Sequence, residues 1–382
     1  MRLTKLFKEF FNSEKAGGLV LICCTILSLI IANSSFGTDY HHFFQILIGN
    51  HSLEQWINDG LMAIFFLLIG LELEREIYLG ELSKLKDALL PLFAALGGMI
   101  IPAGIYLAVN WGKISQSGAG IPMATDIAFA LGILSLLGNK VPTSLKVLLT
   151  ALAVIDDLGA IIIIAIFYTK AIIWANLWIS LGIFGVLLIF NRLKIRNLMP
   201  YLLGGITMWY FMLYSGVHAT ITGVLLAFAI PFGNGDEKST SYILQHQLHH
   251  PVSFAILPIF ALANTVIIFQ GNFSQIITEN YSIGILLGLV LGKPIGIFLI
   301  TYLAVKLGIC KLPSDLDWKI IYSTGFLAGI GFTMSIFITL LAFEDQVIIN
   351  NSKLIILIAS LVAGLIGYVS LKAILTKSYV EE

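Results

Sequence analysis

Apolar segments, each of about 20 residues, recur along almost the whole 382-residue chain, and they constrain its fold more than any other feature. In hydrocarbon every backbone N–H and C=O group must be paired within its own segment, so each segment is expected to cross a bilayer as an α-helix. The chain is 58% hydrophobic and 12% charged, and the charged share is about half that of a soluble domain. We therefore predict an all-α, polytopic membrane protein that forms a single membrane domain over residues 1–382.

The predicted number of spans is about twelve. They begin near residues 12, 56, 88, 122, 144, 174, 199, 216, 252, 282, 318 and 352. The first span follows a basic N-terminal segment, as in a signal peptide, but it lacks a convincing cleavage site and is expected to be retained.

Basic residues are divided unevenly between the two sides of the predicted membrane domain. With the N-terminus in the cytoplasm, all but four of the 22 Lys and Arg residues lie on the cytoplasmic side. Lys113, Lys170 and Lys353 lie on the opposite side, and Lys293 lies within a span. Because Lys and Arg are enriched in cytoplasmic loops, this pattern predicts an even number of spans with both termini in the cytoplasm.

Two predicted spans contain residues that interrupt helices. Pro122 and Gly132 fall in 121-IPMATDIAFALGILSLLG-138, and three glycines fall in 325-GFLAGIGFTMSIF-337. Each is the middle span of a group of three: spans 3 to 5, residues 88–169, and spans 10 to 12, residues 282–376. Interrupted spans at matching positions predict two inverted three-helix repeats around an ion site near the bilayer midplane.

Four ionisable side chains lie deep within predicted spans: Asp126, Asp156, Asp157 and Lys293. A charge at the bilayer centre costs about 2.5 to 3.5 kcal/mol on insertion scales, so such residues usually face a cavity and mark a transport path. Three acids and one base cannot neutralise one another as ions, so at least one acid is protonated or holds a cation. The structural alternative is a set of buried pairs without a transport role.

The carboxylate doublet can serve two purposes at once. Neighbouring residues on a helix point about 100° apart, so one of Asp156 and Asp157 can face a cation while the other meets Lys293. Hard cations prefer oxygen ligands, and Asp126, Asp157 and Thr125 offer them. Because a proton and a cation compete for the same buried carboxylates, this chemistry is that of exchange.

The span that carries Lys293 also has features that favour close helix packing. Its glycines recur every fourth residue, at Gly284, Gly288, Gly292 and Gly296, which predicts a ridge that another helix can approach closely. Pro294 removes one amide donor and permits a bend beside the lysine.

Weaker signals each have a structural alternative. His246, His249 and His250 have the spacing of a transition-metal site, but in a hydrophilic loop they are more simply a solvated cluster. Glu72 could respond to pH or be a charged helix end at the headgroup level. His218 titrates in the right range for a pH response, or it is simply hydrogen bonded.

Several classes of function are disfavoured. The net charge of zero argues against a nucleic-acid partner, and the three cysteines form neither a disulfide framework nor a metal-ligand spacing. The glycine-rich strings lack the Gly-Lys-Ser/Thr of a nucleotide-binding loop. We expect no cofactor and no enzymatic activity.

Strings from several spans resemble the NhaA-type sodium/proton antiporters of bacterial inner membranes, and the similarity runs over nearly the whole chain. The strings are 58-NDGLMAIFFLLIGLELERE-76, 121-IPMATDIAFALGILSLLG-138, 151-ALAVIDDLGAIIIIAIFYT-169, 215-SGVHATITGV-224, 292-GKPIGI-297 and 329-GIGFTMSIFI-338. By this resemblance, Asp156 and Asp157 bind the sodium ion and the protons, with Asp157 the principal ligand. Lys293 pairs with Asp156.

The resemblance also implies roles for residues outside the doublet. Asp126, with Thr125 beside it, balances the facing ends of half-helices, and Glu72 and His218 take part in the pH response. The chain departs from the family's pattern at Gln245, which stands where a funnel glutamate is expected, and at Glu74, which stands where a basic residue is expected. The resemblance therefore does not fix the pH dependence of transport by this chain.

The function implied by the resemblance is electrogenic, pH-regulated secondary antiport of Na⁺ or Li⁺ against H⁺ across the bacterial inner membrane. Such a transporter serves intracellular pH and sodium homeostasis, works in membrane lipid, and forms a homodimer partly through the loop at residues 36–52. Two alternatives stay open: a passive cation channel, which needs a continuous pore, and an intramembrane aspartyl protease, which also uses a buried acid pair.

Overall fold

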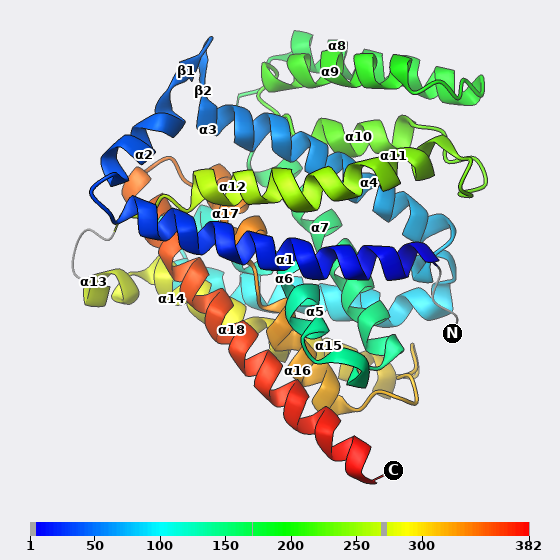
Figure 1. Cartoon of the computed structure of the whole chain (residues 1–382), viewed down its shortest axis with the longest axis vertical. Helices are drawn as coiled ribbons and strands as arrows, with labels where there is room; N and C mark the ends of the chain where they lie inside the picture. Colours follow the sequence, from blue (N-terminus) through cyan, green and yellow to red (C-terminus); the bar gives the residue numbers. More distant parts are fainter. Residues whose placement is uncertain (1–4, 170, 269–272, 382) are drawn as a thin grey trace. The chain divides into compact units, whose positions relative to one another are not determined.

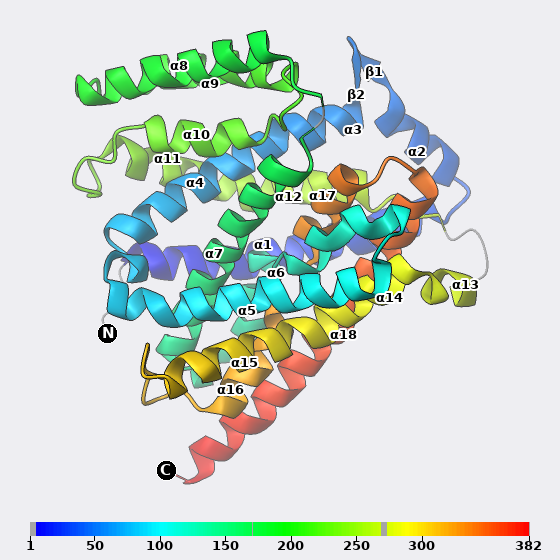
Figure 2. The same cartoon turned by 180° about the vertical axis from the view of Figure 1, so that it is seen from behind.

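The computed structural model describes the backbone of residues 5–169, 171–268 and 273–381, and within these ranges the side chains of 16–80, 82–84, 86–138, 140–169, 171–268 and 273–376. Arg2 and Lys170, which enter the prediction of orientation, and both chain ends lie outside the described residues. Figures 1 and 2 show the chain from opposite sides.

The chain divides into two compact units, each made of segments that are far apart in the sequence. Unit 1 comprises Met1–Ile22, Lys84–Ala160 and Ile267–Glu382, and unit 2 comprises Cys23–Ser83 and Ile161–Val266. Unit 1 contains residues 88–160 of the first predicted repeat and all of the second, 282–376.

Every secondary-structure element in the described part of unit 1 is a helix. Its elements are the first part of α1 (Lys5–Ala32), α5 (Leu85–Asn110), η3 (Ile114–Met123), α6 (Ile127–Ser135), η4 (Gly138–Lys140), most of α7 (Thr143–Phe167), α13 (Phe273–Thr278), α14 (Asn280–Leu287), η6 (Gly288–Gly292), α15 (Lys293–Lys306), α16 (Trp318–Ala328), α17 (Phe332–Ala342) and α18 (Gln346–Glu381).

Unit 2 is helical apart from one short hairpin. Its elements are the remainder of α1 and α7, together with α2 (Gly37–Gln45), β1 (Leu47–Ile48), β2 (His51–Ser52), α3 (Leu53–Gln55), η1 (Trp56–Leu61), α4 (Met62–Tyr78), η2 (Glu81–Ser83), α8 (Trp174–Arg192), α9 (Met199–Leu213), α10 (Ile221–Ala229), α11 (Thr240–Pro251), η5 (Val252–Ile256) and α12 (Leu257–Asn264).

The helical membrane fold predicted from the sequence is confirmed. Seven helices in the described residues are long and apolar enough to cross a membrane, or up to nine if each of two bent pairs counts as one span. Each predicted span falls on a helical segment, but α9 has 15 residues and α10 only 9, short of the length of about 20 that a bilayer requires. The number twelve therefore stays a prediction.

Both predicted interruptions are present. The fourth predicted span consists of the 3₁₀-helix η3 and the α-helix α6, with the extended residue Ala124 after η3 and Asp126 as the N-cap of α6. The eleventh consists of α16 and α17, which meet at an angle of 50° across Gly329, Ile330 and Gly331.

The glycine ridge before and after Lys293 packs against α5, as close helix packing requires. A Cβ added at Gly296 would collide with the carbonyl of Gly97, and one added at Gly97 would collide with the carbonyl of Gly296. Gly292 lies in the same way against Pro102, and α5 runs beside α15 in Figure 2. Ahead of Lys293, the helix widens into the π-helix η6, where the Lys293 N–H donates to the carbonyl of Gly288.

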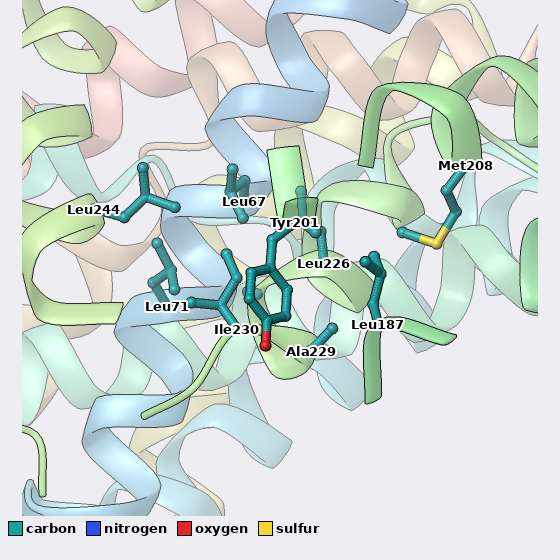
Figure 3. Close-up of a cluster of buried hydrophobic side chains, with 10 residues drawn as sticks. Leu67, Leu71, Leu187, Tyr201, Met208, Leu226, Ala229, Ile230 and Leu244 are labelled. Carbon is teal, nitrogen blue, oxygen red and sulfur yellow. The ribbon is translucent and has the colours of Figure 1, made fainter. Parts of the chain in front are cut away.

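The core of unit 2 is an apolar cluster, which Figure 3 shows in close-up. Its members come from α4, α8, α9, α10 and α11 and the residue after α10: Leu67, Leu71, Leu187, Tyr201, Met208, Leu226, Ala227, Ala229, Ile230 and Leu244. The helices α8 and α9 run side by side in both overall views. The Tyr201 hydroxyl donates to the carbonyl of Ile195, so the polar atom of this ring is satisfied.

The loop expected at residues 36–52 contains secondary structure that was not predicted from the sequence. It contains α2 and an antiparallel hairpin in which Leu47 pairs with Ser52 and Ile48 with His51. Gly49 has φ +68° at the turn, a conformation that glycine adopts without the steric cost of a side chain.

Candidate ion-exchange site

The centre of the candidate site in unit 1 is an ion pair between α15 and α7. Lys293 Nζ lies 2.5 Å from Asp156 Oδ2, and neither side chain has any solvent exposure. The pairing predicted for these two residues is present. Removing two charges from water is costly, and their mutual attraction with further hydrogen bonds offsets the cost.

Thr125 supplies those further hydrogen bonds. Its hydroxyl accepts a hydrogen bond of 2.7 Å from Lys293 Nζ, and its oxygen lies 2.7 Å from Asp156 Oδ2 and 2.9 Å from the carbonyl of Ala328. The hydroxyl has one proton, so it donates to one of these two acceptors at a time. Ala328 is the last residue of α16, and the same hydroxyl therefore joins the ion pair to a helix end.

Asp156 keeps one oxygen out of this network. Oδ1 is buried and has no hydrogen-bond partner among the residues that the structure describes. The neighbouring Asp157 is 1% exposed, and its charge interacts with that of Lys293. One Lys293 ammonium therefore interacts with two successive carboxylates on α7.

Asp126 holds together the point where the two interrupted spans meet. Its backbone N–H donates to the carbonyl of Ile330 at 2.6 Å. Its carboxylate accepts from the N–H of Phe129 at 3.0 Å, from the N–H of Thr333 at 3.0 Å and from the Thr333 hydroxyl at 2.5 Å. A negative charge here lies at the N-termini of α6 and α17, where helix dipoles are positive.

Two serines add hydrogen bonds where the interrupted spans η3–α6 and α16–α17 meet, a region that we call the helix crossing. Ser335 donates to the carbonyl of Ile121 at 2.7 Å, and the Ser360 hydroxyl accepts from the N–H of Phe332 at 3.2 Å. Helix ends leave backbone groups without partners, and here side chains from α17 and α18 supply the missing partners.

The predicted oxygen set is thus divided between two neighbouring clusters. Thr125 joins Asp156 and Lys293, whereas Asp126 joins Thr333 and the helix ends. Within the described part of the chain, no three His, Cys, Asp or Glu residues converge as a metal site would require. A cation bound here must therefore also use hydroxyl or carbonyl oxygens, as hard cations readily do.

The residues predicted to respond to pH belong to unit 2. Glu72 lies on α4 and is 7% exposed. His218 Nε2 lies 3.0 Å from the carbonyl of Tyr168, so this nitrogen is the donor and carries a proton. The partly buried ring is held in one orientation by this bond.

The prediction that the histidine cluster lies in a loop is wrong, whereas the exposure of His246 and His250 agrees with the prediction of a solvated cluster. His246, His249 and His250 lie on α11, because the helix begins at Thr240 rather than after Pro251. Burial, with the nearby charges of His250 and His246, lowers the pKa of His249 to about 4. His249 is consequently neutral at physiological pH.

Several residues of the site escaped the sequence analysis. None of Thr333, Ser335 and Ser360 was predicted as a site residue. The string 329-GIGFTMS-335 contains a signal for Thr333 and Ser335, because hydroxyl residues soon after a glycine break suit the start of a helix. Ser360 has no such signal, since it is 28 residues away from the amide that it caps.

Comparison with known proteins agrees with the resemblance. The family model described as Na⁺/H⁺ antiporter 1 matches residues 8–371. The chain is 70% identical to a Na⁺/H⁺ antiporter NhaA of Flavobacterium psychrophilum over 100% of this chain and 99% of that protein. It is 62% identical to NhaA 1 of Flavobacterium johnsoniae, with 98% and 99% covered, and 62% identical to NhaA of Cytophaga hutchinsonii, with 97% and 96% covered.

An ion pair beside interrupted helices suits ion exchange, and every residue of this site lies within the residues that the family model matches. The chain belongs to the Na⁺/H⁺ antiporter 1 family.

Proposed function

We propose that the protein is a secondary active antiporter that exports Na⁺ or Li⁺ in exchange for H⁺ and so serves intracellular pH and sodium homeostasis. Full-length similarity to proteins named Na⁺/H⁺ antiporter supports the exchange of sodium for protons. Lithium, the electrogenic cycle and the roles of single residues are the finer parts of the proposal.

One observation carries the assignment of the exchange to the carboxylate doublet. Asp156 uses one oxygen for Lys293 and Thr125, while its other oxygen is buried without a hydrogen-bond partner among the described residues. An oxygen in such surroundings favours either a proton or a cation. Asp157, adjacent in sequence and equally buried, is the proposed principal ligand for the cation, with the Thr125 and Asp126 region supplying further oxygens.

The proposed cycle couples two competing occupants of this site. Asp156 and Asp157 take up protons on the outside and lose them on the cytoplasmic side, where Na⁺ then binds and is carried out. In an alternative version, Lys293 rather than Asp156 carries the second proton, and the ion pair opens when the lysine releases it. Both versions move one net charge inward per cycle, worth about 2.3 kcal/mol per 100 mV, so the membrane potential helps to drive sodium out.

The remaining proposals concern regulation and assembly. Glu72 and His218 respond to pH, and Gln245 and Glu74 alter that response relative to the family. Residues 88–169 and 282–376 form the two inverted repeats, and both termini lie in the cytoplasm of a protein of the bacterial inner membrane. A homodimer forms partly through residues 36–52.

Everted membrane vesicles test the exchange directly. Addition of Na⁺ or Li⁺ across a range of pH should dissipate a preformed proton gradient, and Asp157→Asn should abolish this response. Asp317→Asn is the matched control, because Asp317 is an exposed N-cap of α16 whose role an asparagine can also fill. Full activity of Asp157→Asn would overturn the assignment.

The same preparations separate the alternatives. A sodium leak that persists without any proton gradient and without counterflow would favour a channel, and peptide cleavage abolished by Asp157→Asn would favour a protease. Charge movement in proteoliposomes with Asp156 and Lys293 neutralised one at a time decides which of them carries the second proton. Unaltered transport in both variants would remove both versions of the cycle.

A further inference from the structure

One buried hydroxyl on α7 makes no hydrogen bond to a carbonyl of its own helix. Helical threonines commonly donate to the carbonyl four residues earlier, and four in the described helices do so here: Thr207, Thr278, Thr324 and Thr339. Thr150 is different. Its side chain is 7% exposed, and its hydroxyl oxygen is buried without a hydrogen-bond partner among the described residues.

Thr150 lies on the same face of α7 as Asp157. The two are seven residues apart on a continuous α-helix, which brings their side chains to within about 20° of the same direction and separates them by about 10 Å along the axis. Lys146, one turn further from the doublet, lies within about 40° of Thr150. Between Thr150 and Asp157, the side chains nearest this face are those of Ala153 and Val154, both apolar and buried, so the Thr150 hydroxyl is the first polar side-chain atom on this face before Asp157.

A hydroxyl in this position is unfavourable for the fold alone. A buried polar group without a hydrogen bond costs stability, whereas valine would fill the same volume without that cost. What distinguishes this hydroxyl from other buried hydroxyls is its place on the face of α7 that carries Asp157, where it is available to a bound ion. A partly dehydrated alkali cation needs such an oxygen, because each water that it loses must be replaced by another oxygen.

We propose that Thr150 is a transient oxygen ligand for the transported Na⁺ or Li⁺ on its path between the Lys146 end of α7 and Asp157. The inference rests on the proposed function and adds a step to it. At about 10 Å from Asp157 along the helix, the hydroxyl is too distant to bind the ion that Asp157 holds. It therefore lowers the barrier for entry and leaves the equilibrium affinity of the final site unchanged.

Two substitutions separate the hydroxyl from the shape of the side chain. Thr150→Val keeps the shape and should lower kcat/KM for Na⁺ by about threefold to tenfold, the loss expected for one hydrogen-bond-sized interaction. Equilibrium Na⁺ binding should stay within about twofold of wild type, and Tm should be equal or higher because an unsatisfied polar group is removed. Thr150→Ser keeps the hydroxyl and should transport as wild type does. Thr150→Ala, a second variant without the hydroxyl, should share the defect of Thr150→Val.

Thr301→Val is the matched control. Thr301 is fully buried in unit 1, and its hydroxyl also has no hydrogen-bond partner in the described part of the chain. It lies on α15 seven residues after Pro294, on the face that meets α16 at Gly325. Its substitution should leave kcat/KM unchanged.

The outcomes distinguish the inference from the function on which it rests. Wild-type kcat/KM in Thr150→Val, or an equal defect in Thr150→Ser, would overturn the role of the hydroxyl while Asp157→Asn still abolished exchange. A defect of the same size in Thr301→Val would also overturn it. If instead Asp157→Asn retained exchange in the same assay, the proposed function itself would fail.

Discussion

The helix crossing of unit 1 and the apolar cluster of unit 2 are stabilised in opposite ways. At the crossing, Thr125, Asp126, Ser335 and Ser360 bond to backbone groups at the ends of short helices. In the cluster, continuous helices meet through aliphatic side chains, and its one polar atom, the Tyr201 hydroxyl, bonds to a nearby carbonyl.

The difference shows how each region should respond to change. Interrupted helices expose backbone groups that must be paired one by one, so removing a single partner leaves another group buried and unsatisfied. Apolar packing is distributed over many contacts, and truncation costs only what the removed atoms contributed plus the cavity left behind. The proposed exchange belongs with the first kind of region, because a charged site can be loaded and emptied.

The largest effect is expected from separating the ion pair. Lys293→Met leaves Asp156 buried without its countercharge and should reduce the free energy of unfolding by about 3 to 5 kcal/mol. The double variant Lys293→Met with Asp156→Leu should recover most of this loss of stability. Unfolding in detergent measures the stability. A double variant as unstable as the single one would show that the pair does not act as a unit.

A smaller effect is expected in the apolar cluster. Leu226→Ala should reduce the free energy of unfolding by about 2 to 3 kcal/mol through lost burial and a cavity. The leucine packs where a side chain on Gly205 would otherwise lie. The KM for Na⁺ of the remaining folded protein should not change. A clear shift in KM would contradict the view that the apolar cluster contributes to stability and not to ion exchange.

Loss of a single cap at the crossing should have a smaller effect again. Ser360→Ala deprives the Phe332 N–H of its acceptor and should cost about 1 kcal/mol. Ser370→Ala is the control on the same helix, since the hydrogen bonds of the Ser370 hydroxyl among the described residues go to carbonyls of α18 itself. Equal melting temperatures for the two variants would contradict the capping role of Ser360.

The last effect is absent near neutral pH and appears only in acid, in the pH dependence of stability in unit 2. Burial, with the charges of His250 and His246, lowers the pKa of His249 from 6.5 to about 4. Between these two values the unfolded chain binds the proton and the folded protein does not, so stability increases with pH across this window and is lost as the pH falls through it. His249→Asn should flatten the dependence, whereas His42→Asn, on an exposed part of α2, should not. An unchanged slope in His249→Asn would show that this histidine is not the cause.

Much of the architecture could be predicted from local patterns. Periodic apolar segments indicated membrane helices, and Gly329 and Gly331 marked the break between α16 and α17, because glycine and proline act on the backbone where they stand. The start of α11 was missed because its first turns are polar, and hydropathy detects only apolar helices. The hairpin at residues 47–52 was missed because it lies outside the spans.

By itself the sequence determined that three acids and one lysine lie deep within apolar segments, since these segments contain too little polarity to bring them to water. Only the tertiary structure decided how they are shared: Asp156 with Lys293 and Thr125, and Asp126 with the amides of two helices. The physical reason is distance. Hydrogen bonds are made over about 3 Å, and Thr125 and Lys293, which are 168 residues apart in the chain, come within that range only when the helices that carry them have packed.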